Sequence, residues 1–306
     1  MRERQQEPRP SDNLEDPARR AGTGFPGLTL LCGLLLLCAP AAAEQADTSG
    51  PLRFGLLPFA SPVSLFQRFA PLRDYLADRL GTSFELESAR SFAVHVARIE
   101  AGEYDLVLTA PHFVLIALDS GHYHLIAGHR SELSAAFVVA RDDQALTLHD
   151  LAERTIATPP PEALITMVGK EYLLDYMDPS DRLPTFVAYP SHNAAIHAVT
   201  SGLAGAAIAS INAARHEINQ NLAVRILEES DRFPGIGVLA HRRLTERLRD
   251  DIADVLITMA DQADGSDVLR QMDYAGYRST SAQTYEPFRP ILTETRRHLE
   301  APPDTP

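Results

Sequence analysis

Short apolar runs alternate with amphipathic stretches along most of this chain. Residues 52–59 form an apolar run closed by a proline, which predicts a buried strand. Residues 63–80 carry apolar side chains at spacings of three and four and stop at Gly81, which predicts a helix. Strand, helix and strand then recur over 84–87, 91–101 and 104–109, and a helix begins near Pro111. This order predicts an α/β protein with a parallel sheet and helices on both faces.

The same alternation restarts after residue 151, following strands expected at 125–127 and 135–140. Further strands are expected at 155–157, 185–188, 205–209, 223–227 and 237–240. Further helices are expected at 162–176, 191–201, 245–260, 267–272 and 284–299. Two rounds of one α/β pattern predict two Rossmann-like lobes.

Open α/β sheets bind ligands at the carboxyl ends of their strands, so the loops that follow the strands are the places to search. These loops span 58–63, 88–92, 109–113, 158–166, 189–193 and 209–212. None of them carries a Gly-x-Gly-x-x-Gly motif, a Walker loop, a Gly-x-Ser-x-Gly elbow or a His-Glu-x-x-His motif. No nucleophile or acid–base pair stands out either, which argues against an α/β hydrolase or dehydrogenase.

The N-terminal region has the pattern of a secretory signal. An apolar run at 28–38 follows Arg19 and Arg20 and precedes the small residues 39–43. The run is shorter than the roughly 20 residues of a transmembrane helix, although an uncleaved membrane anchor is the alternative. We therefore expect residues 1–43 to be a cleaved signal peptide and the protein to be periplasmic. Cleavage there would remove both cysteines of the chain, which excludes a disulfide in the mature protein.

The formal net charge of the chain is -13, and residues 1–43 contain equal numbers of basic and acidic side chains. The mature protein therefore keeps this acidic balance, which argues against nucleic acid or anionic lipid as a partner. The 11 histidines are scattered without the short spacings of zinc sites, so we expect no metal and no cofactor. Surface histidines are the simpler interpretation.

Several segments, taken in order, resemble the phosphonate-binding family of periplasmic solute-binding proteins, which belong to ABC transporters for phosphate, phosphite or phosphonate. They include Leu-Arg-Phe-Gly-Leu-Leu-Pro at 52–58, Ala-Gly-Glu-Tyr-Asp-Leu-Val-Leu-Thr-Ala-Pro-His at 101–112, and the stretches 71–81, 148–157 and 191–209. The resemblance implies a type-2 periplasmic-binding-protein fold, with two lobes joined by two crossover segments and a ligand cleft between them. The first lobe would be discontinuous, 52–139 plus 237–300, the second would span 140–236, and 301–306 would form a flexible tail.

The resemblance also implies positions for the ligand site, with clear departures from the family pattern. The family's Ser-Thr-Ser run for the oxyanion matches Ala163, Leu164 and Ile165, so Thr166 is the nearest hydroxyl. Thr109 replaces a tyrosine, and Asn212 replaces an acidic residue. His112 is a candidate from its own context, because it follows Pro111 at the start of a helix, where anions are favoured. The candidate ligand-binding residues are Phe92, Thr109, His112, Thr166, His192, Asn193 and Asn212.

Each candidate also has a plain structural interpretation. His192 follows Ser191 at a helix start and is then a surface cap residue, Phe92 is a core aromatic, and Thr109 is a buried hydrogen-bonded threonine. The function expected from the resemblance is the solute-binding component of an ABC importer, binding a small oxyanion or phosphonate-like solute without converting it. We expect a monomer that contacts an inner-membrane permease. The alternatives are presentation of the ligand to a membrane sensor kinase, or an enzyme on the same scaffold.

Overall fold

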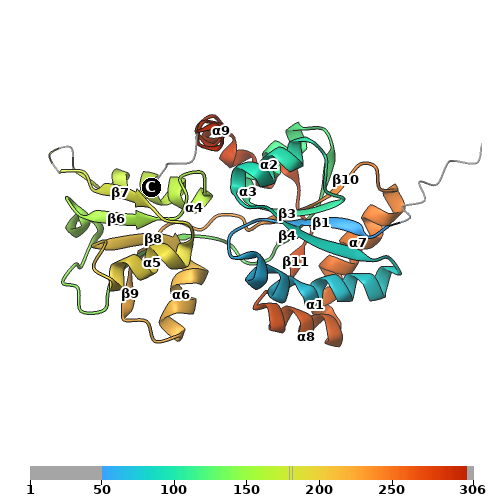
Figure 1. Cartoon of the computed structure of the whole chain (residues 1–306), viewed down its shortest axis with the longest axis horizontal. Coiled ribbons are helices and arrows are strands. Elements are labelled where there is room, and N and C mark those ends of the chain that lie inside the picture. Colours follow the sequence, from blue (N-terminus) through green and yellow to red (C-terminus); the bar gives the residue numbers. More distant parts are fainter. Residues whose placement is uncertain (1–49, 179, 181, 302–306) are drawn as a thin grey trace, which may run out of the picture. The chain divides into compact units, whose positions relative to one another are not determined.

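Two β-sheets, each with helices on both faces, form the part of the chain that the computed structural model describes, residues 50–178, 180 and 182–301 (Figure 1). These residues belong to one compact unit. The predicted signal peptide, 1–43, and nearly all of the predicted tail, 301–306, lie outside the described residues. Within the described ranges, no helix has the length and apolar character needed to cross a membrane.

The first sheet has six strands in the order β11-β4-β10-β3-β1-β2. Strands β1, β2 and β3 are parallel, whereas β10 runs antiparallel to both of its neighbours and β11 runs antiparallel to β4. The strands are β1 (Leu52–Leu56), β2 (Phe84–Ser88), β3 (Leu106–Thr109), β4 (Tyr123–His129), β10 (Gly237–His241) and β11 (Tyr277–Arg278).

Helices on one face of the first sheet are α1 (Pro62–Leu80), α7 (Glu246–Thr258) and α8 (Ala263–Met272) (Figure 1). The other face carries α2 (Phe92–Glu100), α3 (Pro111–Asp119) and α9 (Leu292–Glu300). Short 3-10 turns η2 (Met259–Asp261), η3 (Ala282–Thr284) and η4 (Glu286–Ile291) connect the C-terminal elements.

The second sheet has five strands in the order β7-β6-β8-β5-β9, with β5 antiparallel to both of its neighbours. Its strands are β5 (Ala135–Ala140), β6 (Thr155–Thr158), β7 (Thr185–Ala188), β8 (Ala206–Ser210) and β9 (Val224–Glu229). Its helices are η1 (Leu148–Leu151), α4 (Leu164–Asp175), α5 (His192–Thr200) and α6 (Ile211–Asn219).

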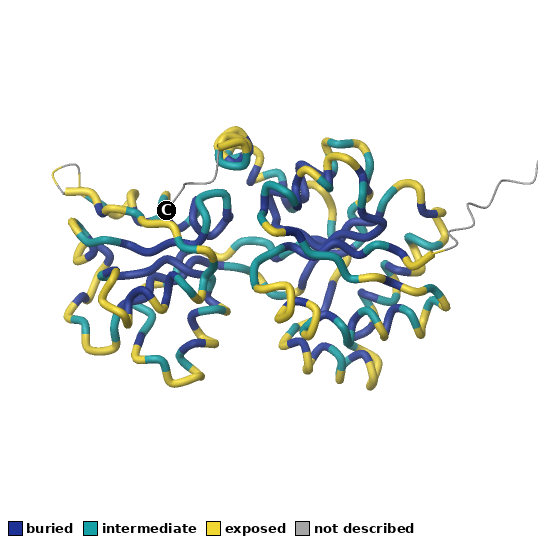
Figure 2. Tube along the Cα trace, viewed as in Figure 1, coloured by how far each residue is buried: buried dark blue, intermediate teal, exposed yellow. Residues whose placement is uncertain are grey.

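Successive side chains along the strands of the second sheet point to opposite faces, and the side chains on each face pack into a separate hydrophobic core. On β5, Ala136 and Val138 pack in the cluster that contains α5 and α6, whereas Phe137 and Val139 pack in the cluster that contains α4. The central strands of both sheets are buried along their length (Figure 2). A strand buried on both faces shows little polar alternation, which is why these strands read as continuous apolar runs.

Two crossover segments join the sheets, one between β4 and β5 and one between β9 and β10. They pair with each other through an antiparallel bridge between Leu133 and Phe233, whose backbone N–H groups each donate to the other's carbonyl at 2.8 and 2.9 Å. This arrangement confirms the predicted two-lobed α/β fold with two crossovers, although each sheet is mixed and not purely parallel.

Three details differ from the sequence expectations. All of β5 pairs in the second sheet, whereas the predicted lobe boundary at 139/140 assigned nearly all of this strand to the first lobe. Helix α6 and strand β11 were not predicted, because α6 has only nine residues with polar and apolar types mixed and β11 has only two. The signal that remains for α6 is Ser210, whose hydroxyl accepts a hydrogen bond from the backbone N–H of Ala213.

Candidate functional site

Three of the sequence-predicted residues lie where strands of the first sheet end. Phe92 begins α2 directly after the Ser91 cap, and its ring centroid lies 6.0 Å from that of Phe113. Thr109 is the last residue of β3, and its Oγ1 lies 3.1 Å from Nε2 of His95. All three candidates of this lobe, Phe92, Thr109 and His112, are buried.

His112, the second residue of α3, connects the two lobes. Its Nε2 lies 3.1 Å from the backbone oxygen of Glu162, so Nε2 carries the proton and donates it to this carbonyl. The ring stacks on Phe113 with centroids 3.9 Å apart. Burial lowers the pKa of His112 to about 4, so the ring is neutral at pH 7. The other nitrogen, Nδ1, has no hydrogen-bond partner among the residues that the structure describes.

The loop that precedes α4 presents apolar groups to the first lobe. Ala163 and Leu164 are buried in the same apolar cluster as the strands of the first sheet. The hydroxyl of Thr166 donates to the carbonyl of Pro159 at 3.1 Å and is fully buried. Two of the three residues that match the family's hydroxyl run therefore pack against the first lobe, and Thr166, the nearest hydroxyl, is already bonded within its own loop.

His192 begins α5 and is held by the end of β8. Its Nδ1 accepts a hydrogen bond from the backbone N–H of Ser210 at 3.1 Å, so the proton of the neutral ring sits on Nε2. Burial lowers the pKa of His192 to about 4, which keeps this tautomer neutral at pH 7. Nε2–H has no partner among the described residues and can donate to a ligand. The neighbouring Asn193 instead donates its side-chain amide to Glu217 at 2.6 Å.

Asn212, the last of the predicted residues, lines a cavity of about 330 Å³. Asn212 is exposed and stands in the first turn of α6, which follows Ser210 directly. Both lobes and both crossover segments contribute to the lining of this cavity. The residues that matter for its chemistry are Arg130 and Arg278 from the first lobe and Asn212, Arg215, Glu229 and Arg232 from the second.

Apart from Asn193, whose amide is bonded to Glu217, the predicted residues therefore fall into two groups. Phe92, Thr109, His112 and Thr166 gather where α3 meets the loop before α4, and their polar side chains are satisfied by the protein except at His112 Nδ1. His192 and Asn212 stand on either side of Ser210 and retain unused donors. Among the described residues, no three histidine, cysteine or acidic side chains form a cluster that could hold a metal ion.

A family model described as "ABC transporter, phosphonate, periplasmic substrate-binding protein" matches residues 54–285. This range covers most of the chain and includes both sheets. The chain belongs to this family. The resemblance found in the sequence is thereby confirmed, and membership gives the chain the general character of a substrate-binding transport protein.

Several solved structures share the fold of this chain. A binding-protein component of a phosphonate ABC transporter from Pseudomonas aeruginosa superposes with a TM-score of 0.69 at 16% identity, covering 81% of this chain and 87% of that chain. A Prochlorococcus marinus protein in complex with methylphosphonate gives a TM-score of 0.68 at 16% identity, with 81% and 97% covered. A Xanthomonas citri protein bound to ATP gives 0.64 at 15% identity, with 81% and 99% covered. At these identities the likeness establishes the fold.

Sequence reasoning missed the arginines around the cavity. The candidate list contains none of Arg130, Arg215, Arg232 and Arg278. They are far apart in the sequence, and two of them stand on α6 and β11, the elements that were not predicted. The usable signal was Arg130, a basic residue directly after a strand that ends at the ligand-binding edge of a lobe.

Proposed function

We propose that this chain is the periplasmic solute-binding subunit of an ABC importer and holds a small oxyanion or phosphonate-like solute between its lobes without converting it. The single observation that carries this proposal is the family match over 54–285, which spans both sheets and both crossovers. The partner is a permease in the inner membrane, and the binding protein acts as a monomer.

The paired crossovers give a physical basis for this role. A solute that contacts residues of both lobes binds more tightly to the conformation in which those residues face each other, and so shifts the population toward it. His192 Nε2–H and the first turn of α6 offer donors from the second lobe for this purpose. Both histidines are neutral, so neither supplies a counter-charge, and only His192 has an N–H group left to donate to an anion, because His112 donates its single proton to Glu162.

Calorimetric titration of the purified protein tests the proposal. The panel is methylphosphonate, phosphite, phosphate, sulfate and a small carboxylate, and the expected result is saturable binding of at least one oxyanion. Mass spectrometry of the released solute should show the added compound unchanged. Absence of binding across the panel, or conversion of the bound compound, would overturn the proposal.

A matched pair of substitutions then tests the role of His192. In His192→Asn the amide oxygen takes the place of Nδ1 and still accepts from Ser210, but the Nε2–H donor is lost. His192→Gln places its amide near the Nε2 position instead. We expect about a tenfold loss of oxyanion affinity for His192→Asn, as for a lost hydrogen bond to a charged group, and a smaller loss for His192→Gln. Equal affinities for both variants and the wild type would remove His192 from the site.

A further inference from the structure

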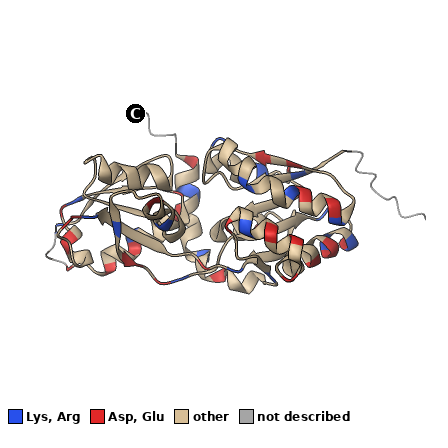
Figure 3. Ribbon diagram, turned by 90° about the horizontal axis from the view of Figure 1, so that it is seen from below, with Lys and Arg blue, Asp and Glu red and all other residues tan. Residues whose placement is uncertain are grey.

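The cavity beside Asn212 carries an excess of positive charge in a chain that is strongly acidic. Four arginines and two glutamates line it, Arg130, Arg215, Arg232, Arg278, Glu132 and Glu229, whereas the whole chain has a formal net charge of -13. Over the outer helices of the first lobe, acidic and basic positions are instead interspersed (Figure 3). A local surplus of two positive charges therefore needs an explanation other than general surface composition.

The two arginines from the first lobe lack carboxylate partners. Arg130 donates from Nε to the carbonyl of Tyr277 at 2.8 Å and from an Nη to the carbonyl of Ile257 at 3.3 Å. These carbonyls fix the guanidinium in place but do not neutralise its charge. Arg278, on β11, has neither a hydrogen bond nor an ion pair from its side chain among the described residues, and it is exposed.

The acidic residue of the second lobe is already shared. Glu229 accepts a hydrogen bond from the hydroxyl of Ser134 at 2.7 Å, and its carboxylate also lies 3.5 Å from Arg215 and 3.6 Å from Arg232. One carboxylate thus serves two guanidinium groups. Glu132 is exposed and forms no ion pair within the part of the chain that the structure describes. The surplus charge stays available to a ligand.

The start of α6 adds neutral donors opposite these arginines. The backbone N–H of Ile211 donates to Ser134, and that of Ala213 donates to the hydroxyl of Ser210. The backbone N–H of Asn212 and its side-chain amide have no partners among the described residues. Free N–H groups at a helix start favour an anion, and here they face a cavity that arginines already make positive.

The size of the cavity selects among anions. Its volume is about 330 Å³. It lies at the lower end of the range of about 300–1,000 Å³ found for small-molecule sites. A bare oxyanion would leave most of this space to water.

We infer that Arg130 and Arg278, together with Asn212, hold the doubly charged head of the ligand in this chain, a phosphate monoester or substituted phosphonate whose organic group occupies the remaining space. The inference rests on the proposed function and names the residues that supply the counter-charge for the ligand. Such a ligand would join the first lobe to the second beside the crossover, so its binding would favour the conformation that brings these residues together. The anion would then be held by arginines instead of the hydroxyl run that this chain lacks at 163–165.

The test is calorimetric titration of the purified protein with methylphosphonate, glycerol 3-phosphate and adenosine 5′-monophosphate, with methanesulfonate as a singly charged control. We expect at least one phosphorus compound to bind about tenfold more tightly than methanesulfonate, because the second charge pairs with the second guanidinium. Arg278→Gln should weaken that binding about tenfold, and Arg278→Gln combined with Arg215→Gln should weaken it further.

Arg242→Gln is the matched control. Arg242 is exposed and lies just beyond the end of β10 that is farther from the cavity. Its substitution removes one positive charge, as Arg278→Gln does, so the ligand affinity of the variant should stay within about twofold of that of the wild type. If the wild type binds a phosphorus compound and the two Arg278 variants bind it equally well, the inference is wrong and the proposed function stands. If the wild type binds none of the phosphorus compounds but binds another oxyanion, the inference is again wrong. If it binds no oxyanion at all, the proposed function fails with it.

Discussion

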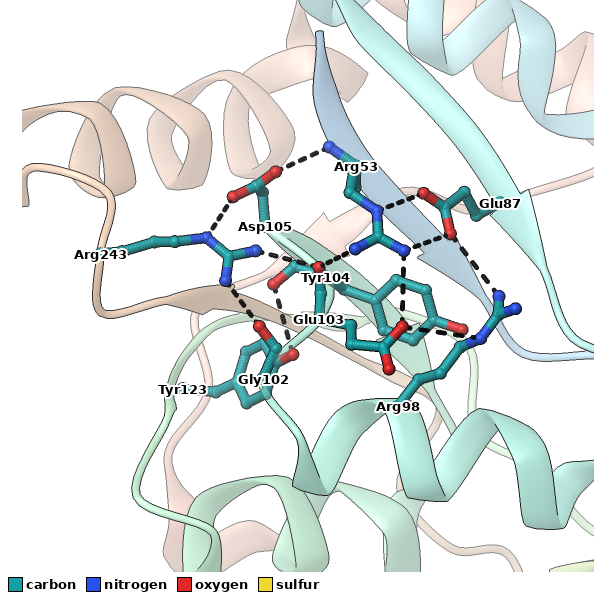
Figure 4. Close-up of polar contacts among 9 residues, drawn as sticks. All are labelled: Arg53, Glu87, Arg98, Gly102, Glu103, Tyr104, Asp105, Tyr123 and Arg243. Atoms are coloured by element: carbon teal, nitrogen blue, oxygen red, sulfur yellow. Dashed lines mark hydrogen bonds and ion pairs between the residues drawn. The ribbon is translucent and has the colours of Figure 1, made fainter. Parts of the chain in front are cut away.

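Arginines occupy two contrasting environments in the first lobe. At the amino ends of β1 and β3, guanidinium groups alternate with carboxylates in one network (Figure 4), which consists of Arg53, Glu87, Arg98, Glu103, Asp105 and Arg243. At the carboxyl end of β4 and on β11, Arg130 and Arg278 meet backbone carbonyls or solvent. The same residue type is fully paired at one end of the sheet and left unpaired at the other.

The difference separates arginines that stabilise the fold from arginines that await a ligand. In the network, the hydrogen bond to Glu87 raises the pKa of Arg53 above its usual value, and each charge is offset by its neighbours. In the cavity no such offset exists on the first-lobe side, so the unpaired charges repel each other and add nothing to stability. An unbalanced cluster at the carboxyl ends of the strands, where α/β folds bind ligands, indicates a binding role.

The largest effect that would test this comparison is the loss of Asp105. Its carboxylate is buried and accepts hydrogen bonds from the backbone N–H of Arg53 at 2.8 Å and from Nε of Arg243 at 2.6 Å. Asp105→Asn removes the charge that offsets Arg243 and places an amide N–H near one of these donors. We expect the free energy of unfolding to fall by about 3 kcal/mol in urea denaturation, with ligand affinity unchanged.

A neighbouring pair provides the control for that change. Asp251→Asn breaks the exposed ion pair with Arg247, whose atoms lie 3.7 Å apart, and should cost less than about 0.5 kcal/mol. Equal losses for Asp105→Asn and Asp251→Asn would mean that the network contributes no more than an ordinary surface pair. The two arginine environments would then not differ in stability.

A second, smaller effect is the pH dependence of stability that comes from His112. It tests whether arginines alone carry positive charge near the site, as the comparison of the two arginine environments assumes. Burial lowers the pKa of His112 to about 4, against about 6.5 in an unfolded chain. The unfolded state therefore takes up a proton between these values while the folded state does not. Stability from this group is present above about pH 6.5 and is lost as the pH falls toward 4.

The measurement is urea denaturation of the wild type and of His112→Gln, whose amide can still donate to the carbonyl of Glu162. Between pH 6.5 and 5, the wild type should lose about 1.5 kcal/mol more of its free energy of unfolding than the variant does. Parallel pH profiles for the two proteins would show that His112 titrates normally in the folded state. The positive charge at the site could then no longer be assigned to arginine alone.

The sequence predicted most of the fold, because long strands and helices have strong periodic patterns. The apolar runs of β1 and β5 and the regular spacing along α1 each marked an element within a few residues of its observed bounds. Ser91 also marked the start of α2 correctly. The boundary of the lobes was misplaced at β5, because an apolar run does not show which sheet a strand joins.

The candidate site was much harder to predict, for a physical reason. Residues that meet at the cavity come from α6, β9, β11 and both crossover segments, and the pairing state of an arginine depends on neighbours that are distant in sequence. Nothing in the sequence distinguishes Arg278, which is unpaired, from Arg243, which bonds to Asp105. The family pattern pointed to 163–165, where this chain has apolar side chains that pack in the core of the first lobe or of the second.

The smallest expected effect comes from increasing the excess of positive charge in the cavity itself. Glu229→Gln removes the one carboxylate that faces Arg215 and Arg232, while its amide oxygen can still accept from Ser134. The cavity then gains a further positive charge without a change of shape. We expect the affinity for the phosphorus compound that binds best to rise about threefold at low salt, and the gain to shrink as ionic strength rises.

Glu228→Gln is the control, because it makes the same change in charge one residue away, where the side chain points to the other face of β9. An unchanged affinity in Glu229→Gln, or an equal gain in Glu228→Gln, would show that charge inside the cavity does not control anion binding.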